Sequence, residues 1–452
     1  MPSAAALRRR VCRGARAVVV LMAAAGSSIA ATEHPSSAMP LSFGEAITLA
    51  GRRYVDVLVA NERAAQALAR LSQARSVLWP QVTASASQAR GTTNLDALGL
   101  NQPGGQSLVG PFNTFDARVK LTQTVFDAGA LQRLAAARAG RQLSLAQYEQ
   151  AKQDAMALVA ALFLEAVRAA QSLEPAQAVL HREQQRVTVL ATQYQIGTAS
   201  SLQVRQAQAD EAEARARWQA ATSESLERQL DLIAALRLPM DQPLVLLDDD
   251  EALGVDAPGS SAQARAVAEH PEVLVAQRLL MQYRAEHAAE LADAIPTVTA
   301  SVNYGASGKQ PGDAEGTYGV GAQVSMPLLT GGRRVARVRE AGSRAREGQA
   351  TLDDARHRVE ATLLSAAEAL QQSAAAVAAK TTELKLAATE TTLAEERLRL
   401  GIGTELDLLE ARTRAALAKD QRADAIATLR MAQVTLAHAM GHVEALAGKS
   451  DG

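Results

Sequence analysis

The chain has 452 residues, a formal net charge of −1 and an aromatic content of only 3%. Positive and negative side chains are interspersed, so the sequence offers no basic surface of the kind that binds nucleic acid. Alanine is the main apolar residue, which favours close packing of helices over a bulky globular core.

The N-terminus has the order of regions found in a secretory signal peptide. Arginines precede an apolar run over residues 17–25, which is too short to span a membrane as a helix. Ser28, Ile29 and Ala30 then fit a cleavage site. We therefore expect a signal peptide over residues 1–31 and a polar N-terminal lead over residues 32–40. The alternative is the amphipathic start of a cytosolic helix.

The single cysteine, Cys12, precedes the apolar run and would be removed with the signal peptide. The mature chain would then contain neither a disulfide nor a cysteine-based metal site. No later stretch has eighteen consecutive apolar residues, so no transmembrane helix is expected. An exported chain could still enter an outer membrane as strands, whose sequence signal is much weaker.

Residues 41–240 predict a first structural repeat of helices and strands. Ser42 and Glu45 have the spacing of a capping box, so a helix is expected to begin at Leu41. It is expected to continue as helix over residues 52–78 and to end at Trp79 and Pro80, because proline cannot continue the hydrogen-bond ladder. The other predicted elements are strands over 81–89 and 116–125, a long helix over 131–196 and a helix over 202–236. The long helix would measure roughly 100 Å.

The same order recurs in a second structural repeat over residues 259–441, after a linker over residues 241–258. Gly129 corresponds to Gly332 and Gly197 to Gly401, close to the ends of the two predicted long helices. The second copy predicts strands over 297–304 and 318–326 and a long helix over 333–400. Its shorter loop between the strands explains the difference in length, because surface loops tolerate insertions. Residues 442–452 form a C-terminal tail.

The long helix of the second repeat carries apolar residues at alternating spacings of three and four, the pattern of a coiled-coil seam. The summed length of the two shorter helices in each repeat matches that of the long one, so the shorter pair is expected to lie end to end along it. The strand hairpin then lies at one end, and the turns at Gly197 and Gly401 lie at the other.

The predicted fold class is therefore mainly α, with a long coiled-coil helical tunnel and four strands per chain. Four strands cannot close a membrane barrel, since the smallest have about eight. An open sheet in lipid would leave unsatisfied backbone groups at its edges. We therefore expect several chains to share one barrel. The alternative is a small soluble sheet.

These features resemble the TolC family of bacterial outer-membrane efflux channels over residues 41–441. The resemblance rests on the duplicated helix–hairpin–helix order and on the proline that closes each helix before a strand. It also rests on residues 126–129 and 329–332 after each hairpin (FDAG and LTGG). The most specific pattern is that of residues 399–411, RLGIGTELDLLEA, at the second predicted turn.

The resemblance implies a homotrimer in the outer membrane, with a shared twelve-stranded barrel in lipid and a periplasmic extension of twelve helices. Such channels dock onto a periplasmic adaptor (membrane fusion) protein and an inner-membrane RND, MFS or ABC transporter. They conduct drugs, metal ions or unfolded proteins passively, without catalysis or a cofactor, and bind no nucleic acid. The residues do not distinguish small-molecule efflux from type I protein secretion.

The resemblance also implies a gate at the periplasmic entrance, formed by acidic residues that map onto Asp407 and Glu410. Spaced three residues apart, they share one helix face, and in a trimer they would form a ring of carboxylates. The alternative is an ordinary solvated helix face. The family's tyrosine and arginine that tie neighbouring helices together are replaced here by Leu398 and Gly403, and an acidic partner is replaced by Gln203.

The two turns are the predicted contacts with the adaptor. The residues concerned are Gly197, Thr198, Gly401, Gly403 and Thr404. The alternative is plain turn chemistry, because glycine and threonine are common in turns. Aromatic residues flank the predicted strands and could form girdles at the membrane surfaces, or could pack in a core or a loop. They are Trp79, Phe112, Phe126, Tyr304 and Tyr318.

Other groups of polar residues give weaker evidence for a functional site. His438 and His442 lie four residues apart, but no third ligand is near, so no metal site is expected. The acidic run over residues 248–251 lacks the glycine and spaced ligands of a calcium loop. No phosphate-binding loop or nucleophile elbow occurs. The second functional hypothesis is a periplasmic coiled-coil adaptor or scaffold without a pore, but two copies that each carry a strand pair argue against it.

Overall fold

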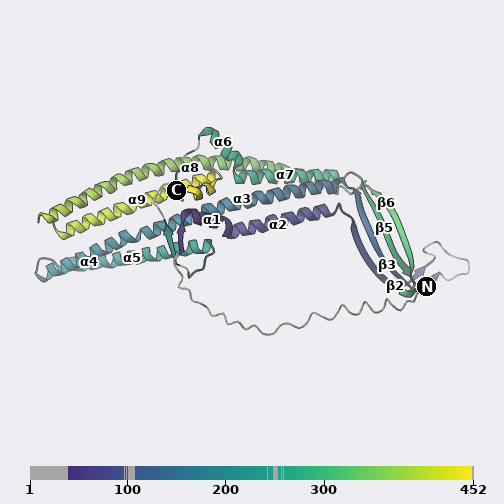
Figure 1. Cartoon of the computed structure of the whole chain (residues 1–452), viewed down its shortest axis with the longest axis horizontal. Helices are drawn as coiled ribbons and strands as arrows, with labels where there is room; N and C mark the ends of the chain where they lie inside the picture. Colours follow the sequence, from purple (N-terminus) through teal and green to yellow (C-terminus); the bar gives the residue numbers. More distant parts are fainter. Residues whose placement is uncertain are drawn as a thin grey trace, which may run out of the picture.

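The computed structural model describes residues 39–449 except residues 96, 98, 100–106, 242, 248–252, 256 and 258, so the predicted signal peptide and the acidic run lie outside the described residues. The molecule is a long rod with a sheet at one end and two helical hairpin tips at the other (Figure 1). Its elements in chain order are β1 (Met39–Ser42), α1 (Phe43–Arg53), α2 (Val55–Ser76), β2 (Gln81–Asn94), β3 (Leu108–Phe126), α3 (Ala128–Gln171), α4 (Leu173–Gln195), α5 (Ser201–Ala235), β4 (Leu244–Leu247), α6 (Ser260–Glu269), α7 (Pro271–Ala292), β5 (Thr297–Gly308), η2 (Pro311–Asp313), β6 (Glu315–Ser325), α8 (Arg333–Arg399), α9 (Glu405–Ala439) and η3 (Val443–Lys449).

The predicted capping box is confirmed at the start of α1. The Ser42 side chain accepts a hydrogen bond from the Glu45 backbone, and the Glu45 carboxylate accepts one from the Ser42 backbone. The first helix is not continuous, however, because Tyr54 adopts an extended backbone conformation between α1 and α2. His270 does the same between α6 and α7. The break therefore occurs at the same place in both copies, and Pro271 follows it at the first helical position, which proline favours.

The long helix of the first copy is also interrupted, contrary to the prediction of one continuous helix. It divides at Ser172 into α3 and α4. Pro175 explains the division, because proline lacks the N–H that would bond to the carbonyl of Gln171 and its ring crowds that carbonyl. The second long helix, α8, has no proline and runs from Arg333 to Arg399 without a break.

The predicted coiled-coil seam is confirmed on α8. Its apolar side chains pack against α7 toward the sheet and against α9 toward the tip. The buried members are Leu352, Ala355, Val359, Leu363, Ala366 and Leu370. The shorter helices therefore lie end to end along the long one, as the matching lengths predict.

The main core lies midway along the rod, where parts of both repeats meet. Phe43 of α1 and Phe163 of α3 contact edge to face with ring centroids 5.6 Å apart. Leu232 of α5, Val434 of α9 and Val443 of η3 also belong to this cluster. The C-terminal tail is therefore partly structural, which the sequence analysis did not predict.

The N-terminal lead and the linker between the repeats also contain structure that was not predicted. Met39–Ser42 (β1) pairs in parallel with Leu244–Leu247 (β4), so that the two segments form a small two-stranded sheet beside the core. Leu41 and Leu244 are buried in that core. This pairing anchors the linker to the start of the first repeat.

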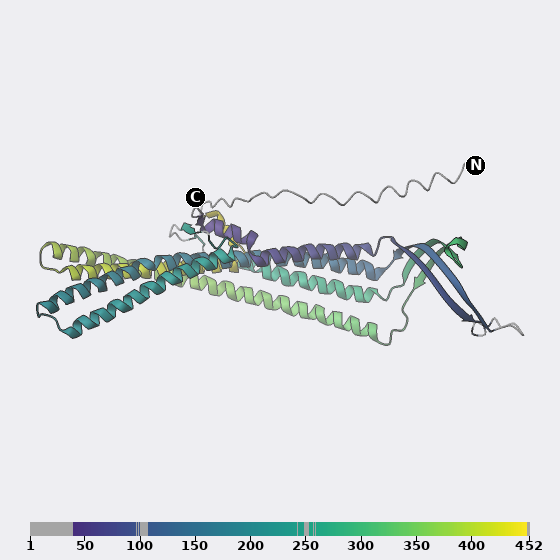
Figure 2. The same ribbon diagram turned by 90° about the horizontal axis from the view of Figure 1, so that it is seen from below.

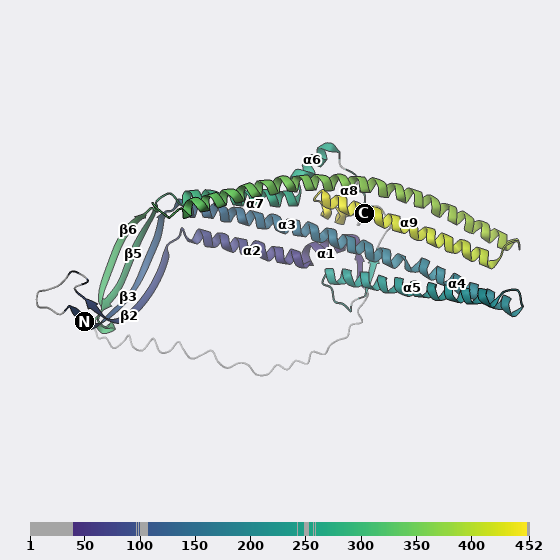
Figure 3. The ribbon, with the colours of Figure 1, turned by 180° about the vertical axis from the view of Figure 1, so that it is seen from behind.

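The four strands β2, β3, β5 and β6 form one antiparallel sheet in that order. They are longer than predicted, because residues near the hairpin loops, such as Arg90 and Phe112, still pair although the simple alternation of the sequence is lost there. The sheet lies beyond the end of the helices, as seen from both sides of the rod (Figures 1 and 3).

Among the residues that the structure describes, one helical stretch is long and apolar enough to cross a membrane by these two criteria alone. It is Ala128–Gln195, with a mean hydropathy of 1.5 in its most apolar window, and 44% of that window is buried against the rest of the chain. Val159, Phe163 and Val167 of this stretch belong to the main core. Core packing therefore accounts for its composition.

A polar contact crosses the middle of the rod at His270. Its Nδ1 accepts a hydrogen bond from the Glu272 N–H at 3.2 Å, and its Nε2 donates to the His438 carbonyl at 3.2 Å. The His438 ring in turn lies 2.7 Å from Asp154 of α3. Burial lowers the pKa of His270, against the opposing effects of the His438 carbonyl, Glu272 and Asp154. His270 is therefore held neutral, and protonation would place a hydrogen between Nδ1 and the N–H that it caps.

We predict that stability depends on pH through His270. Because its folded-state pKa lies below the unfolded value of about 6.5, its stabilising contribution is complete above that pH and is lost as the pH falls below it. His270→Asn keeps a capping acceptor but does not titrate, so thermal unfolding of this variant in detergent should depend less on pH between about 5 and 7. His357→Gln, at an exposed position on α8, is the control. Equal pH dependence in wild type and His270→Asn would contradict the assignment.

Candidate functional site

The two helical hairpins end in turns with the same backbone geometry. In the first, the Gly197 N–H bonds to the Tyr194 carbonyl and the Thr198 N–H to the Gln193 carbonyl. In the second, Gly401 and Ile402 make the equivalent bonds back into α8. This is a Schellman motif, which requires a left-handed residue after the helix, and Gly197 and Gly401 have φ values of 81° and 74°.

The helix that follows each turn begins with a capping box. Ser200 exchanges hydrogen bonds with Gln203 at the start of α5, and Thr404 exchanges them with Asp407 at the start of α9. Gln203 and Asp407 are therefore equivalent positions, one neutral and one acidic. Hydrogen bonds from the Thr404 backbone and hydroxyl lower the pKa of Asp407, with a smaller contribution from Arg397. Asp407 consequently stays charged over the whole physiological range, and its capping contribution is lost only in acid, as the pH falls through the lowered pKa.

The structure places the predicted gate residues close to the second tip. Asp407 and Glu410 lie in the first two turns of α9, and both are exposed. Asp407 caps the start of α9, and its role in a gate stays a prediction. Gly403 lies against the end of α8, where an added Cβ would be 3.1 Å from the Cβ of Arg397.

The predicted contacts for an adaptor divide into two separate groups. Gly197 and Thr198 lie at the tip of the α4–α5 hairpin, whereas Gly401, Gly403 and Thr404 lie at the tip of the α8–α9 hairpin. The two tips end apart in both perpendicular views (Figures 1 and 2). All five residues lie at the end of the rod opposite the sheet, but a single chain does not bring the two groups together.

Ion pairs connect the two hairpins between the core and the tips. Arg168 of α3 lies 2.7 Å from Asp420 and 3.1 Å from Asp424 of α9. Closer to the tips, Glu174 of α4 lies 2.6 Å from Lys419 of α9. These pairs are partly exposed, so each contributes at most about 1 kcal/mol. Together they fix how α9 lies along α3 and α4.

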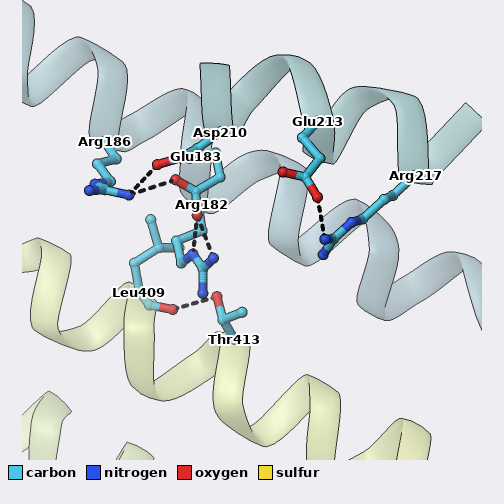
Figure 4. A network of polar contacts seen from close by, with 8 residues as sticks. All are labelled: Arg182, Glu183, Arg186, Asp210, Glu213, Arg217, Leu409 and Thr413. Carbon is cyan, nitrogen blue, oxygen red and sulfur yellow. Dashed lines mark hydrogen bonds and ion pairs between the residues drawn. The ribbon is translucent and has the colours of Figure 1, made fainter. Parts of the chain in front are cut away.

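A buried carboxylate lies on α4, further toward the tips. Glu183 of α4 is only 4% exposed and bonds to Arg182 and Arg186, and Arg186 also reaches Asp210 of α5. Arg182 points toward Thr413 of α9, whose hydroxyl donates to the Leu409 carbonyl (Figure 4). This cluster is not apparent from the local sequence, because Glu183 and Asp210 lie on different helices.

Beside this cluster the two hairpins border a groove with both apolar and polar lining residues, the latter including His181, Gln185 and Arg412. It has a volume of about 270 Å³ and is lined by residues of α4, α8 and α9, among them Val189, Leu398 and Leu409. Leu398 therefore lines this groove, where the resemblance expected a tyrosine that ties neighbouring helices together.

The sheet has one apolar and one polar face, because side chains alternate along each strand and the strands are in register. Two adjacent rows across the four strands are wholly apolar: Val82, Leu121, Val302 and Val320, and Ala84, Val119, Tyr304 and Tyr318. Their side chains are exposed in the single chain, with Tyr318 at 82% and Val320 at 74%. On the other face, the rows from Gln81 to Ser87 are polar or glycine.

Both outer strands of this sheet have an unpaired edge. Within the described part of the chain, β2 pairs only with β3 and β6 pairs only with β5. Each edge therefore presents a row of free backbone N–H and C=O groups, which another chain can pair with.

The flanking aromatic residues are all exposed. Phe126 and Trp79 lie where the strands meet the helices, and Phe112 lies toward the hairpin loop. Tyr304 and Tyr318 are paired neighbours within the sheet on its apolar face. A girdle role for the first three residues stays a prediction.

Of the two histidines near the end of α9, His438 has its Nε2 atom 2.7 Å from Asp154 Oδ1. Across the described residues, no three His, Cys, Asp or Glu side chains gather closely enough to hold a metal ion.

Comparisons with known proteins agree on one family. The sequence model described as "Outer membrane efflux protein" matches residues 47–236 and 263–442. The alkaline protease secretion protein AprF of Pseudomonas aeruginosa is 25% identical over 320 residues, which cover 66% of this chain and 64% of that protein. The aligned region thus spans less than two thirds of the relative.

Solved outer-membrane channels share the fold. The Campylobacter jejuni channel CmeC superposes with a TM-score of 0.76 at 17% identity, covering 88% of this chain and 85% of that one. The Neisseria gonorrhoeae channel MtrE, solved in its open state, superposes with a TM-score of 0.72 at 19% identity, covering 88% and 89%. The predicted resemblance is therefore confirmed at the level of family and fold.

We predict that Thr404 stabilises the start of α9 locally. Thr404→Ala removes the capping hydroxyl, at a cost of about 1 kcal/mol, so amide hydrogen exchange at residues 405–408 should become about fivefold faster. Ser200→Ala is the matched control at the other tip, where only the start of α5 should exchange faster. Unchanged exchange in α9 of Thr404→Ala would show that the capping box does not hold this turn.

Proposed function

Because the chain belongs to the outer membrane efflux protein family, we propose that three copies form the channel of a tripartite export system. The protein is an outer-membrane protein with a helical extension in the periplasm. In the proposed assembly, residues 41–240 and 259–441 are the two repeats of each subunit. The channel conducts substrates passively from a periplasmic adaptor and an inner-membrane transporter to the outside.

The observation that carries the proposal is the four-stranded sheet with an exposed apolar face and two free edges. In lipid, each unsatisfied backbone group at those edges would cost several kcal/mol. Pairing β6 of one copy with β2 of the next removes both edges. Three copies then supply twelve strands, which is within the range of closed membrane barrels.

The helices support the same assembly. The shared sheet would place three rods around one axis, so that the helical hairpins of each copy continue the barrel as a tunnel. The tips at Gly197 and Gly401 then form the far end of that tunnel, where we place the contact with the adaptor. A periplasmic adaptor without a pore is not favoured, because soluble proteins rarely expose an apolar surface as large as this face of the sheet.

The cargo class follows from the transporter that the channel serves. The relative AprF is named for alkaline protease secretion, whereas the family is named for efflux. Export of a protein by an ABC transporter and efflux of small molecules by an RND or MFS transporter are both compatible with a passive conduit. Deleting the gene and comparing drug sensitivity with the secreted proteins distinguishes the two.

We predict that the purified protein is a trimer that forms pores. Light scattering in detergent should give about three times the protomer mass, and addition to a planar bilayer should produce discrete conductance steps. A protomer of single mass that needs no detergent would contradict the proposal, as would a stable trimer that never conducts.

We predict that the acidic residues at the second tip restrict the entrance. If Asp407 and Glu410 face the axis, three copies place six carboxylates around it, which repel one another and attract cations. Asp407→Ala combined with Glu410→Ala should raise single-channel conductance and weaken cation selectivity. Glu405→Ala, on the same helix turn, is the control for a general loss of charge. Unchanged conductance and selectivity in the double variant would remove this role.

A further inference from the structure

The polar face of the sheet carries its charges in separate rows. Three successive rows are Ser87, Asp116, Ser307 and Glu315; then Ser85, Arg118, Gly305 and Thr317; then Thr83, Lys120, Asn303 and Gly319. The first row lies toward the hairpin loops and holds both acidic residues. The third lies toward the helices and has a single charge, that of Lys120.

Arg118 is neutralised within the sheet. Its guanidinium bonds to Asp116 on the same strand and lies 3.4 Å from the amide oxygen of Asn303. Gly305 leaves room for this arrangement, because an added Cβ there would be 2.4 Å from the Cβ of Arg118. The positive charge of Arg118 therefore remains beside the carboxylate and projects little further.

Lys120, in contrast, has no ion-pair partner among the residues that the structure describes. Its side chain is exposed, and its paired neighbours are the uncharged Thr83 on β2 and Asn303 on β5. Glu315 lies four residues further along β6 than Gly319, which is about 13 Å along the strands. That separation exceeds the Debye length of about 8 Å at physiological ionic strength.

The polar face must line the lumen if the sheet belongs to a barrel in lipid. Membrane barrels present apolar side chains to lipid and polar side chains to the interior. The rows of Val320 and Tyr318 form the lipid face, so Lys120, on the opposite face, points toward the axis. This step depends on the trimeric barrel proposed above.

We propose that Lys120 sets the charge selectivity of the barrel lumen. In the trimer, three copies form a ring of ammonium groups that attracts small anions and the anionic groups of a passing cargo. The ring lies in the sheet, far from the carboxylates of Asp407 and Glu410 at the tips. The two ends of the conduit thus carry rings of opposite charge, and Lys120 is the specificity-determining residue of the outer one.

The test is the reversal potential of single channels in planar bilayers under a KCl gradient. Lys120→Gln should lower the ratio of anion to cation permeability by about twofold or more, and Lys120→Glu should lower it further. The effect should be greater at about 0.1 M salt than at about 1 M, where screening is stronger. Lys120→Arg keeps the charge and is the matched control, with the ratio of the wild type. Unchanged reversal potentials in both Lys120→Gln and Lys120→Glu would overturn the proposal.

A second measurement tests the position of the side chain directly. The predicted mature chain has no cysteine, so Lys120→Cys in a Cys12→Ser background introduces a single thiol. A water-soluble, positively charged thiol reagent should react with open channels and restore the anion permeability, and a negatively charged one should lower it further. A thiol that reacts only with lipid-soluble reagents would place residue 120 on the lipid face and overturn the proposal.

These outcomes separate the two proposals. If the wild type forms no trimer and no pore, the proposed function fails before selectivity can be measured. If pores form but neither the Lys120 variants nor the thiol reagents alter permeability, the proposed function stands and the role of Lys120 is wrong.

Discussion

The backbone hydrogen bonds of the sheet edges are the constraint on which the rest of the molecule depends. The edges of β2 and β6 have no partner within the described chain, and the sheet exposes an apolar face beside them. Water could satisfy those edge groups, but it would not favour the apolar face; lipid would favour the face but not the edges. In the proposed assembly, pairing with further copies would meet both demands, with the closed symmetry of a ring.

The helical part follows from the position of the sheet. The strand hairpins lead into the long helices α3 and α8, so in the proposed assembly a ring of strands would extend into a ring of rods. Small side chains suit this arrangement, because the alanine-rich seam of α8 lets helices pack closely over a great length. Bulky residues such as Phe163 are confined to the middle, where both repeats, the linker strand and the tail meet in one core. That core joins the two repeats of the chain, while the two hairpin tips end apart.

Much of this architecture could be predicted from the sequence, because the strands and long helices produce regular patterns within single segments. The alternation of apolar and polar residues around Val119 and Val302 predicted the strands. The spacing of apolar residues from Leu352 to Leu370 predicted the coiled-coil seam of α8. Elements that depend on distant partners were missed: β1 and β4 are four residues each and are stabilised by pairing with each other. The break at Ser172 follows from Pro175, but it was not predicted because the residues on both sides of this proline favour a helix. The burial of Glu183 and the charge rows of the sheet depend on register between elements, which no single segment specifies.

The most direct test of the account is whether neighbouring copies join through the free edges of the sheet. The predicted mature chain has no cysteine. Variants in a Cys12→Ser background can therefore carry one cysteine on β2 and one on β6, at a series of paired positions, and be oxidised in outer membranes. The account predicts disulfide-linked dimers and trimers on denaturing gels for one register of pairs, and none for cysteines in the middle strands β3 and β5. Monomers alone at every register tested, from a protein that is otherwise folded in the membrane, would contradict it.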